Sequence, residues 1–212
     1  MPVVFEANSD GTNSRWYKHH SLVRFYLDQA YTFSLKARDE HFEGAMMASS
    51  IIGILFSAMS LEAFCNETAE DIISEHELND FQFCRGRFKA RNSSAVSKLD
   101  YLFSETFEKG LPVQLKQKAT NIFSIRNNLS HYKLSEMATV YEGPSIGNRS
   151  ENPKSPLIVD FEAEVKKTNP ALVERITGVA AVESFNTALD IITEWGKRKG
   201  LDDNVPGLST IS

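Results

Sequence analysis

Residues 122–132, IFSIRNNLSHY, form the stretch that decides how this chain folds, because they combine a helical apolar pattern with charged and polar side chains. At about 100° per residue, Arg126 falls near the middle of the apolar arc. A permanent cation in an apolar stripe departs from the amphipathic pattern of a helix, and such departures concentrate at functional or strained sites. The arc itself consists of residues that recur at steps of three or four: Leu115, Ala119, Ile122, Ile125, Leu129 and Tyr132.

The polar residues beside Arg126 have two interpretations. Asn127 and His131 lie four positions apart on a neighbouring face of the helix, and Ser130 lies one turn beyond Arg126. In a functional interpretation, the arginine binds a phosphate and the histidine transfers protons. In a structural interpretation, Arg126 is a snorkelling or ion-paired side chain and His131 belongs to a frayed helix end. The spacing alone is compatible with both.

Composition predicts one soluble globular domain. Of the 212 residues, 42% are hydrophobic and 24% charged, and the formal net charge is −5. This net negative charge gives no overall indication of nucleic-acid binding, although a local basic patch can still bind nucleic acid. Cys65 and Cys84 fit small buried hydrophobes with reduced thiols, and the first ten residues lack the basic and apolar regions of a secretory signal. We therefore expect a cytoplasmic protein.

Residues 44–61, GAMMASSIIGILFSAMSL, are eighteen residues without a charge, which is long enough to span a membrane. Internal serines and glycines, Glu62 directly afterwards and the lack of flanking Lys or Arg argue against a span. We expect instead a helix buried in a bundle or at a subunit interface, and no membrane partner. Glu62 and Asn66 share a face at its polar end. Glu62 is the predicted partner of Arg126, because a buried arginine needs an acidic or carbonyl group.

The carboxylates at the end of this helix, Glu62, Glu67 and Glu70, also suggest a di-iron site of the four-helix kind. Such sites use Glu-x-x-His pairs, and none of the five histidines has a Glu three residues before it. We therefore expect no metal and no cofactor.

Residues 77–92 are predicted to be a connector with a local basic patch. Its cations alternate with Gly86, Phe88 and Ala90, and Phe81 and Phe83 lie just upstream. Cations with aromatic residues nearby can contact phosphates and stack bases, whereas a plain solvated loop is the alternative. The candidate RNA-binding residues are Arg85, Arg87, Lys89 and Arg91.

The remaining pattern predicts an all-α antiparallel bundle of four to five helices that forms a dimer. The domain is expected over residues 19–200, after a flexible arm at 1–18 and before a disordered tail at 201–212. Residues 134–175 are predicted to be an inserted loop or small β-hairpin before the last helix, placed where it can cover the site. Within them, residues 157–165 alternate strictly between apolar and charged side chains, and 139–142 is the expected second strand.

Two helix ends resemble the HEPN superfamily (higher eukaryote and prokaryote nucleotide-binding domains). One ends LEAFCNE at residues 61–67, and the other ends RNNLSHY at 126–132. The signature of the family is an Arg, then four to six residues of which the first is polar, then a His. Here these are Arg126, Asn127 and His131, with a spacer of four.

The resemblance covers residues 20–132 and the final helix, and the insertion at 134–175 departs from the compact family pattern. It implies an all-α bundle that dimerises with the two motifs facing each other. Active members are metal-independent endoribonucleases, many of them bacterial toxins or antiviral effectors. Arg126, Asn127 and His131 would then be catalytic, with Glu62, Asn66 and Ser130 in support and RNA as substrate.

The same resemblance leaves other functions open. In toxin–antitoxin or phage-defence systems, an antitoxin or a nucleotidyltransferase would be a partner. Other members of the family are non-catalytic and bind nucleotides or serve as dimeric interaction modules. A structural or regulatory helical protein without a ligand is the third reading of the sequence.

Overall fold

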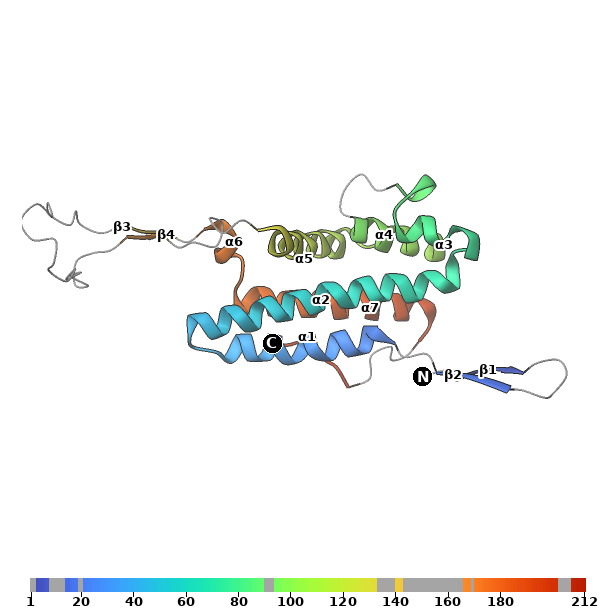
Figure 1. The fold of residues 1–212 in the computed structure, drawn as a ribbon, viewed down its shortest axis with the longest axis horizontal. Coiled ribbons are helices and arrows are strands. Elements are labelled where there is room, and N and C mark those ends of the chain that lie inside the picture. The colour runs from blue at the N-terminus through green and yellow to red at the C-terminus, as the bar shows by residue number, and fades with distance from the viewer. Residues whose placement is uncertain are drawn as a thin grey trace, which may run out of the picture.

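The computed structural model of this chain is mostly helical, which agrees with the predicted all-α class (Figure 1). It describes residues 3–7, 14–18, 21–89, 94–132, 140–142, 166–168, 170–201 and 207–212. Its helices are α1 (Leu22–Asp39), α2 (Glu43–Ile72), α3 (Glu75–Gln82), the 3-10 turn η1 (Gly86–Phe88), α4 (Ser94–Phe107), α5 (Val113–His131), α6 (Ala171–Glu174) and α7 (Gly178–Lys199).

Short strands occur in two antiparallel pairs. β1 (Val3–Ala7) pairs with β2 (Ser14–Lys18) in the region where the sequence predicts a flexible arm. β3 (Val140–Glu142) pairs with β4 (Lys166–Thr168). The strand predicted over 157–165 lies outside the described residues, so the inserted hairpin stays a prediction.

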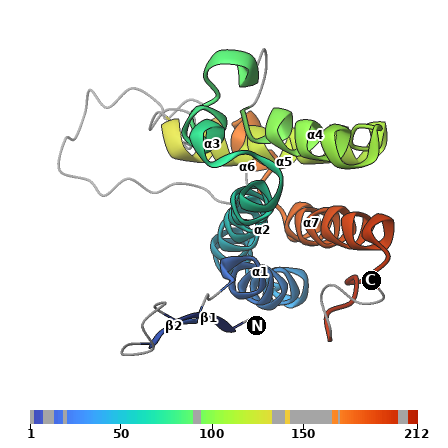
Figure 2. The ribbon, with the colours of Figure 1, turned by 90° about the vertical axis from the view of Figure 1, so that its right-hand side faces the viewer.

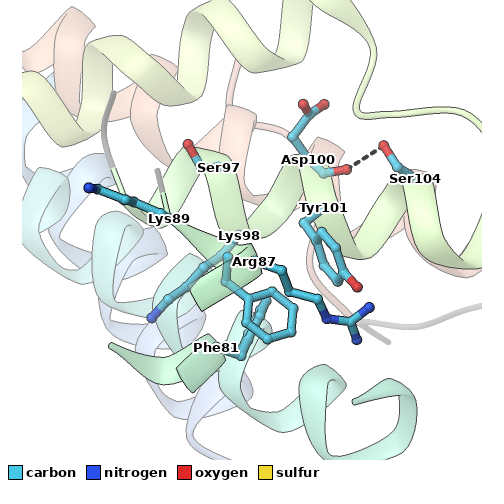
Figure 3. Close-up of a pocket in the computed structure, with 9 residues that line it drawn as sticks. Phe81, Arg87, Lys89, Ser97, Lys98, Asp100, Tyr101 and Ser104 are labelled. Carbon is cyan, nitrogen blue, oxygen red and sulfur yellow. Dashed lines mark hydrogen bonds between the residues drawn. The ribbon is translucent and has the colours of Figure 1, made fainter. Parts of the chain in front are cut away.

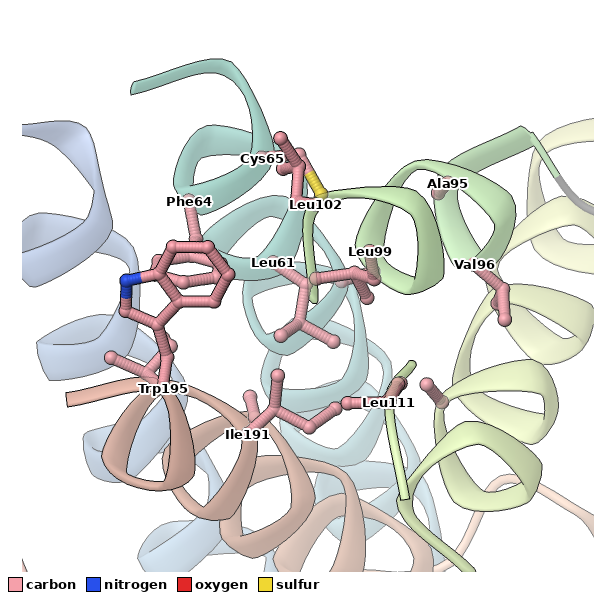
Figure 4. Packing of buried hydrophobic residues seen from close by; sticks show 14 of the residues in the cluster. Leu61, Phe64, Cys65, Ala95, Val96, Leu99, Leu102, Leu111, Ile191 and Trp195 are labelled. Atoms are coloured by element: carbon pink, nitrogen blue, oxygen red, sulfur yellow. The ribbon is translucent and has the colours of Figure 1, made fainter. Parts of the chain in front are cut away.

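α2 is the central helix of the bundle. It packs against α1 and α7 on one side and against α4 and α5 on the other (Figures 1 and 2). Its apolar residues meet those of α4 and α7 in one core, where the side chains of Leu61, Leu99 and Ile191 have no exposed surface (Figure 4). The ring of Trp195 packs at the edge of this core. It contacts the Phe103 ring edge-on, with 5.0 Å between the ring centres, and it contacts other rings as well. The position of α2 explains why its sequence is apolar over so long a stretch.

By length and composition alone, α2 could also cross a membrane. Its most apolar window has a mean hydropathy of 1.7, and 44% of that window is buried inside the protein. The serines of this stretch are accommodated within the helix: the hydroxyls of Ser50, Ser57 and Ser60 donate to backbone carbonyls of α2 at 2.7–2.8 Å. These bonds satisfy polar groups that would otherwise be costly to bury.

Residues 77–92, predicted as a connector, instead contain most of α3, which begins at Glu75, and all of η1. The helix begins after Ser74, whose hydroxyl donates to Glu77 Oε2 at 2.7 Å. A Ser followed three residues later by a Glu is the sequence pattern of a helix N-terminus. The signal for α3 was therefore present in the sequence.

The prediction of a disordered tail is wrong for residues 207–212. Ile211 is buried, and its backbone N–H and C=O pair with the Asn186 side-chain amide at 2.8 and 2.9 Å. Arg38 Nη1 donates to the Ser212 carbonyl at 3.0 Å. One buried side chain and one amide pair hold this segment on α1 and α7, and six residues are too few for such an anchor to appear as a periodic pattern.

Gly178, the first residue of α7, sets how closely α7 approaches α1. A Cβ at this position would lie 2.5 Å from the Ala37 carbonyl oxygen and 3.0 Å from its carbon. Because backbone atoms cannot move aside cheaply, we expect Gly178→Ala to lower the free energy of unfolding by about 1–3 kcal/mol. Urea denaturation of both proteins measures the difference.

The neighbouring residue provides the matched control. Val179 is 68% exposed, so Val179→Ala should change the free energy of unfolding by less than about 0.5 kcal/mol. If Gly178→Ala were as stable as Val179→Ala, the close contact between α7 and α1 would be contradicted.

Candidate functional site

Arg126 lies on α5, and its guanidinium group reaches α2. Its Nη2 donates to Glu62 Oε1, so the predicted ion pair is present. Its Nη1 donates to Asn127 Oδ1 at 2.9 Å, and the guanidinium carbon lies 5.7 Å from the centre of the Phe123 ring. One carboxylate, one amide and one ring therefore fix the orientation of the arginine.

Arg126 lies at the edge of the buried arc rather than in its middle. Ile122, Phe123 and Ile125 are buried, but the Arg126 side chain keeps 28% of its surface exposed and Glu62 keeps 40%. An ion pair this exposed contributes only about 0–1 kcal/mol to stability. The main consequence of the pair is that Glu62 holds the Arg126 guanidinium group at the protein surface, where an anion of a ligand can contact it.

The other polar residues of the motif lie on the last turns of α5. Ser130 Oγ donates to the Arg126 carbonyl at 3.0 Å, which closes the final turn. His131 is the last residue of the helix and is exposed. The imidazole makes no hydrogen bond to any other residue that the structure describes. It lies about 7.5 Å along the helix axis from Arg126.

A pocket of about 250 Å³ opens beside Glu62. Asn66, predicted to support the site, lines it one turn along α2 from Glu62, and Phe83 from the end of α3 forms another part of its wall. We call it the Phe83 pocket. Its lining residues are Glu62, Cys65, Asn66, Gln82, Phe83, Ala95 and Lys98.

The predicted RNA-binding cations differ in their surroundings. Arg87 Nη2 is paired with Glu77 Oε2 at 2.8 Å, and this pairing is a secondary reason, after the Ser74 hydroxyl, why the pKa of Glu77 lies below its usual value. Arg85 lies over the exposed ring of Phe83 at 5.1 Å. Arg91 lies outside the described residues.

A second pocket, of about 300 Å³, is lined by two of the predicted cations, Arg87 and Lys89, and by Lys98. Arg87 lies 6.0 Å from the centre of the Tyr101 ring and Lys98 Nζ 5.6 Å from that of Phe81, while Lys89 lines another part of the pocket (Figure 3). Arg87 also lies over Phe88, at 4.8 Å from the ring centre. Phe81 and Phe88 are almost completely buried, so the core and these cations together cover their faces. This pocket therefore offers cations but little free aromatic surface.

Lys98 is a cation shared by both pockets that sequence reasoning missed. It comes from α4, lines both pockets and donates from Nζ to the Gln82 carbonyl at 2.7 Å. A single lysine within an amphipathic helix carries no signal of this role. Only the packing of α4 against the end of α3 brings it beside Glu62 and Phe83.

Cys65 forms the inert base of the Phe83 pocket. It is buried, and burial raises the pKa of its thiol to about 12, so the sulfur stays protonated and unreactive. The interpretation of the two cysteines as small buried hydrophobes is confirmed for Cys65, whereas Cys84 is only half-buried.

Two further results describe the site as a whole. Within the described part of the chain, no three His, Cys, Asp or Glu side chains are grouped so that they could hold a metal ion. Comparisons of the chain with protein-family models, with curated proteins and with solved structures find no match.

Proposed function

We propose that this protein is a metal-independent endoribonuclease of the HEPN type, with one active site formed where the α5 ends of two copies meet. The observation that carries the proposal is the Arg126 guanidinium group, held by Glu62 yet partly exposed, on the same helix end as the exposed His131. Arginine binds phosphate through two parallel hydrogen bonds, and histidine transfers protons near neutral pH. The resemblance to bacterial toxins and antiviral effectors suggests a toxin–antitoxin or phage-defence role.

The reaction needs three functions from the protein. A base takes the proton of a ribose 2′-hydroxyl, and the 2′-oxygen then attacks the neighbouring phosphorus. The bond from phosphorus to the 5′-oxygen breaks, and an acid protonates that oxygen. A cation stabilises the negative charge of the phosphorane in between. The products carry a 2′,3′-cyclic phosphate and a 5′-hydroxyl.

Two copies of the chain supply these functions together. In each copy His131 is one proton-transfer group, and the other described histidines, His41 and His76, lie outside α5. A two-fold axis at the end of α5 would bring a second His131 and a second Arg126 to the same cleft. One imidazole then acts as base, the other as acid, and Arg126 binds the phosphate with Asn127 orienting it.

A surface beside the site fits such a dimer. Ala48, Ile52, Leu55 and Met59 follow one another on α2 at steps of three or four, and each is half-buried or exposed. Met59, which is 36% exposed, lies three residues before Glu62. An apolar stripe that leads to a polar site is the kind of surface that a second copy covers.

Met59→Glu tests whether this stripe forms the dimer. Near a two-fold axis the new charge would meet an apolar surface and its own copy, so we expect the dissociation constant of the dimer to rise at least about tenfold. Sedimentation velocity over a concentration series measures it. Val113→Glu, at an apolar residue that is 80% exposed on α5, is the control and should leave association unchanged. A wild-type protein that stays monomeric would contradict the composite site.

The proposed activity is tested with the purified full-length protein and transfer RNA in the presence of EDTA. We expect internal cleavage with 2′,3′-cyclic phosphate ends, detected by end-specific labelling. Intact RNA would contradict the nuclease. If nucleotides then raised the melting temperature, the non-catalytic nucleotide-binding alternative would replace it.

A further inference from the structure

The Phe83 pocket adjoins the candidate catalytic residues through a shared side chain. Glu62 lines the pocket and also accepts the hydrogen bond from Arg126 Nη2. A nucleotide whose phosphate is bound by Arg126 therefore lies next to this pocket, because only the Glu62 side chain separates the two. The pocket volume of about 250 Å³ lies below the roughly 300 Å³ at which sites for drug-sized ligands begin, so it suits one flat, base-sized group.

Phe83 gives the pocket an aromatic wall that is unusually open. Phe83 is 57% exposed, although large aromatic residues generally bury most of their surface. The guanidinium group of Arg85 lies 5.1 Å from the ring centre. An exposed ring with a guanidinium group beside it is the arrangement on which unpaired bases stack in proteins that bind single strands.

The backbone at the end of α3 holds Phe83 in this position. The next residue, Cys84, has a φ of +50°, in the left-handed region that residues with a Cβ rarely adopt. Lys98 from α4 fixes the same turn through its bond to the Gln82 carbonyl. Strained backbone that is held from a neighbouring element concentrates at ligand sites.

Polar groups of the pocket are available to a ligand. Asn66 and Gln82 are exposed, and their side-chain amides make no hydrogen bond to any described residue. Each amide offers both a donor and an acceptor, which is what the edge of a base requires. The base of the pocket is apolar, since Cys65 and Ala95 are buried.

We infer that the Phe83 pocket binds an unpaired nucleobase next to the cleaved phosphate of single-stranded RNA. Phe83 stacks on the base, Asn66 and Gln82 bind its edge, and Lys98 balances the charge of the strand. The inference rests on the proposed function, because that function puts a phosphate at Arg126. It gives the enzyme a preference for loops and single strands over duplex RNA.

Phe83→Ala tests the inference through binding rather than cleavage. The probe is a fluorescent single-stranded oligonucleotide with 2′-O-methyl groups, which cannot be cleaved, and the readout is fluorescence anisotropy. Since stacking of one base on an aromatic residue is worth roughly 5- to 150-fold in affinity, we expect the dissociation constant to rise by about that factor. Phe83→Tyr should restore binding, because tyrosine keeps the ring.

Phe42→Ala is the matched control, because Phe42 is also an exposed aromatic residue, at 72%, but does not line the pocket. Its affinity for the oligonucleotide should equal that of the wild type. Equal affinity of Phe83→Ala would overturn the inference. If Phe83→Ala lost binding while the wild type cleaved no RNA, the pocket would stand and only the nuclease would fail.

Discussion

Replacing His131 with alanine is expected to lower the rate of RNA cleavage by about 10²–10⁴-fold, the usual loss when a general acid or base is removed. His131 is exposed at the last position of α5, so the fold and its melting temperature should not change. Single-turnover cleavage of end-labelled RNA in EDTA measures the effect. Measuring this rate at saturating protein concentration distinguishes a slower chemical step from weaker binding of RNA.

Another exposed histidine provides the control for this substitution. His76 lies on α3 and is exposed, so His76→Ala should cleave RNA at the wild-type rate. If His131→Ala were as active as His76→Ala, His131 would not be the proton-transfer residue. The composite site would then be wrong even if the protein cleaved RNA.

Arg126→Lys is expected to slow cleavage by about 10²–10³-fold. Enzymes usually lose this much when one preorganised hydrogen-bond donor to the transition state is removed. Lysine keeps the positive charge but not the planar fork that binds two phosphate oxygens at once. It also cannot bind Glu62 and Asn127 in the same geometry. The loss should appear in the single-turnover rate at saturating protein, more than in the affinity for uncleavable RNA.

Arg24→Lys is the corresponding control, because Arg24 is an exposed arginine of α1 that is ion-paired with Asp28 four residues later. We expect it to cleave RNA as the wild type does. An Arg126→Lys variant with an unchanged rate would show that only charge is needed there, and the phosphate clamp would have to be abandoned.

The elements that the sequence predicts correctly are those with long periodic patterns. Ala119, Ile122 and Ile125 recur at helical steps, and all three are buried on α5. The pair of Arg126 and Glu62 was predictable for a different reason. A cation directed toward a core needs a carboxylate, and α2 offered one at its polar end.

The features that the sequence did not predict depend on contacts between distant segments. The Phe83 pocket needs Lys98 of α4 beside the end of α3, and neither segment reveals the other. The anchoring of Ile211 by Asn186 likewise joins residues that are 25 positions apart. Such contacts follow from packing, which no local pattern of residue types encodes.

The composite site is tested most directly by mixing two versions of the protein. His131→Ala is added to wild-type protein at constant total concentration, the subunits are allowed to exchange, and RNA cleavage is measured. Because each site needs both copies of His131, activity should fall with the square of the wild-type fraction, so that an equal mixture keeps about a quarter of it. A fall in simple proportion, to about half in the equal mixture, would show that each chain acts alone and would contradict the account.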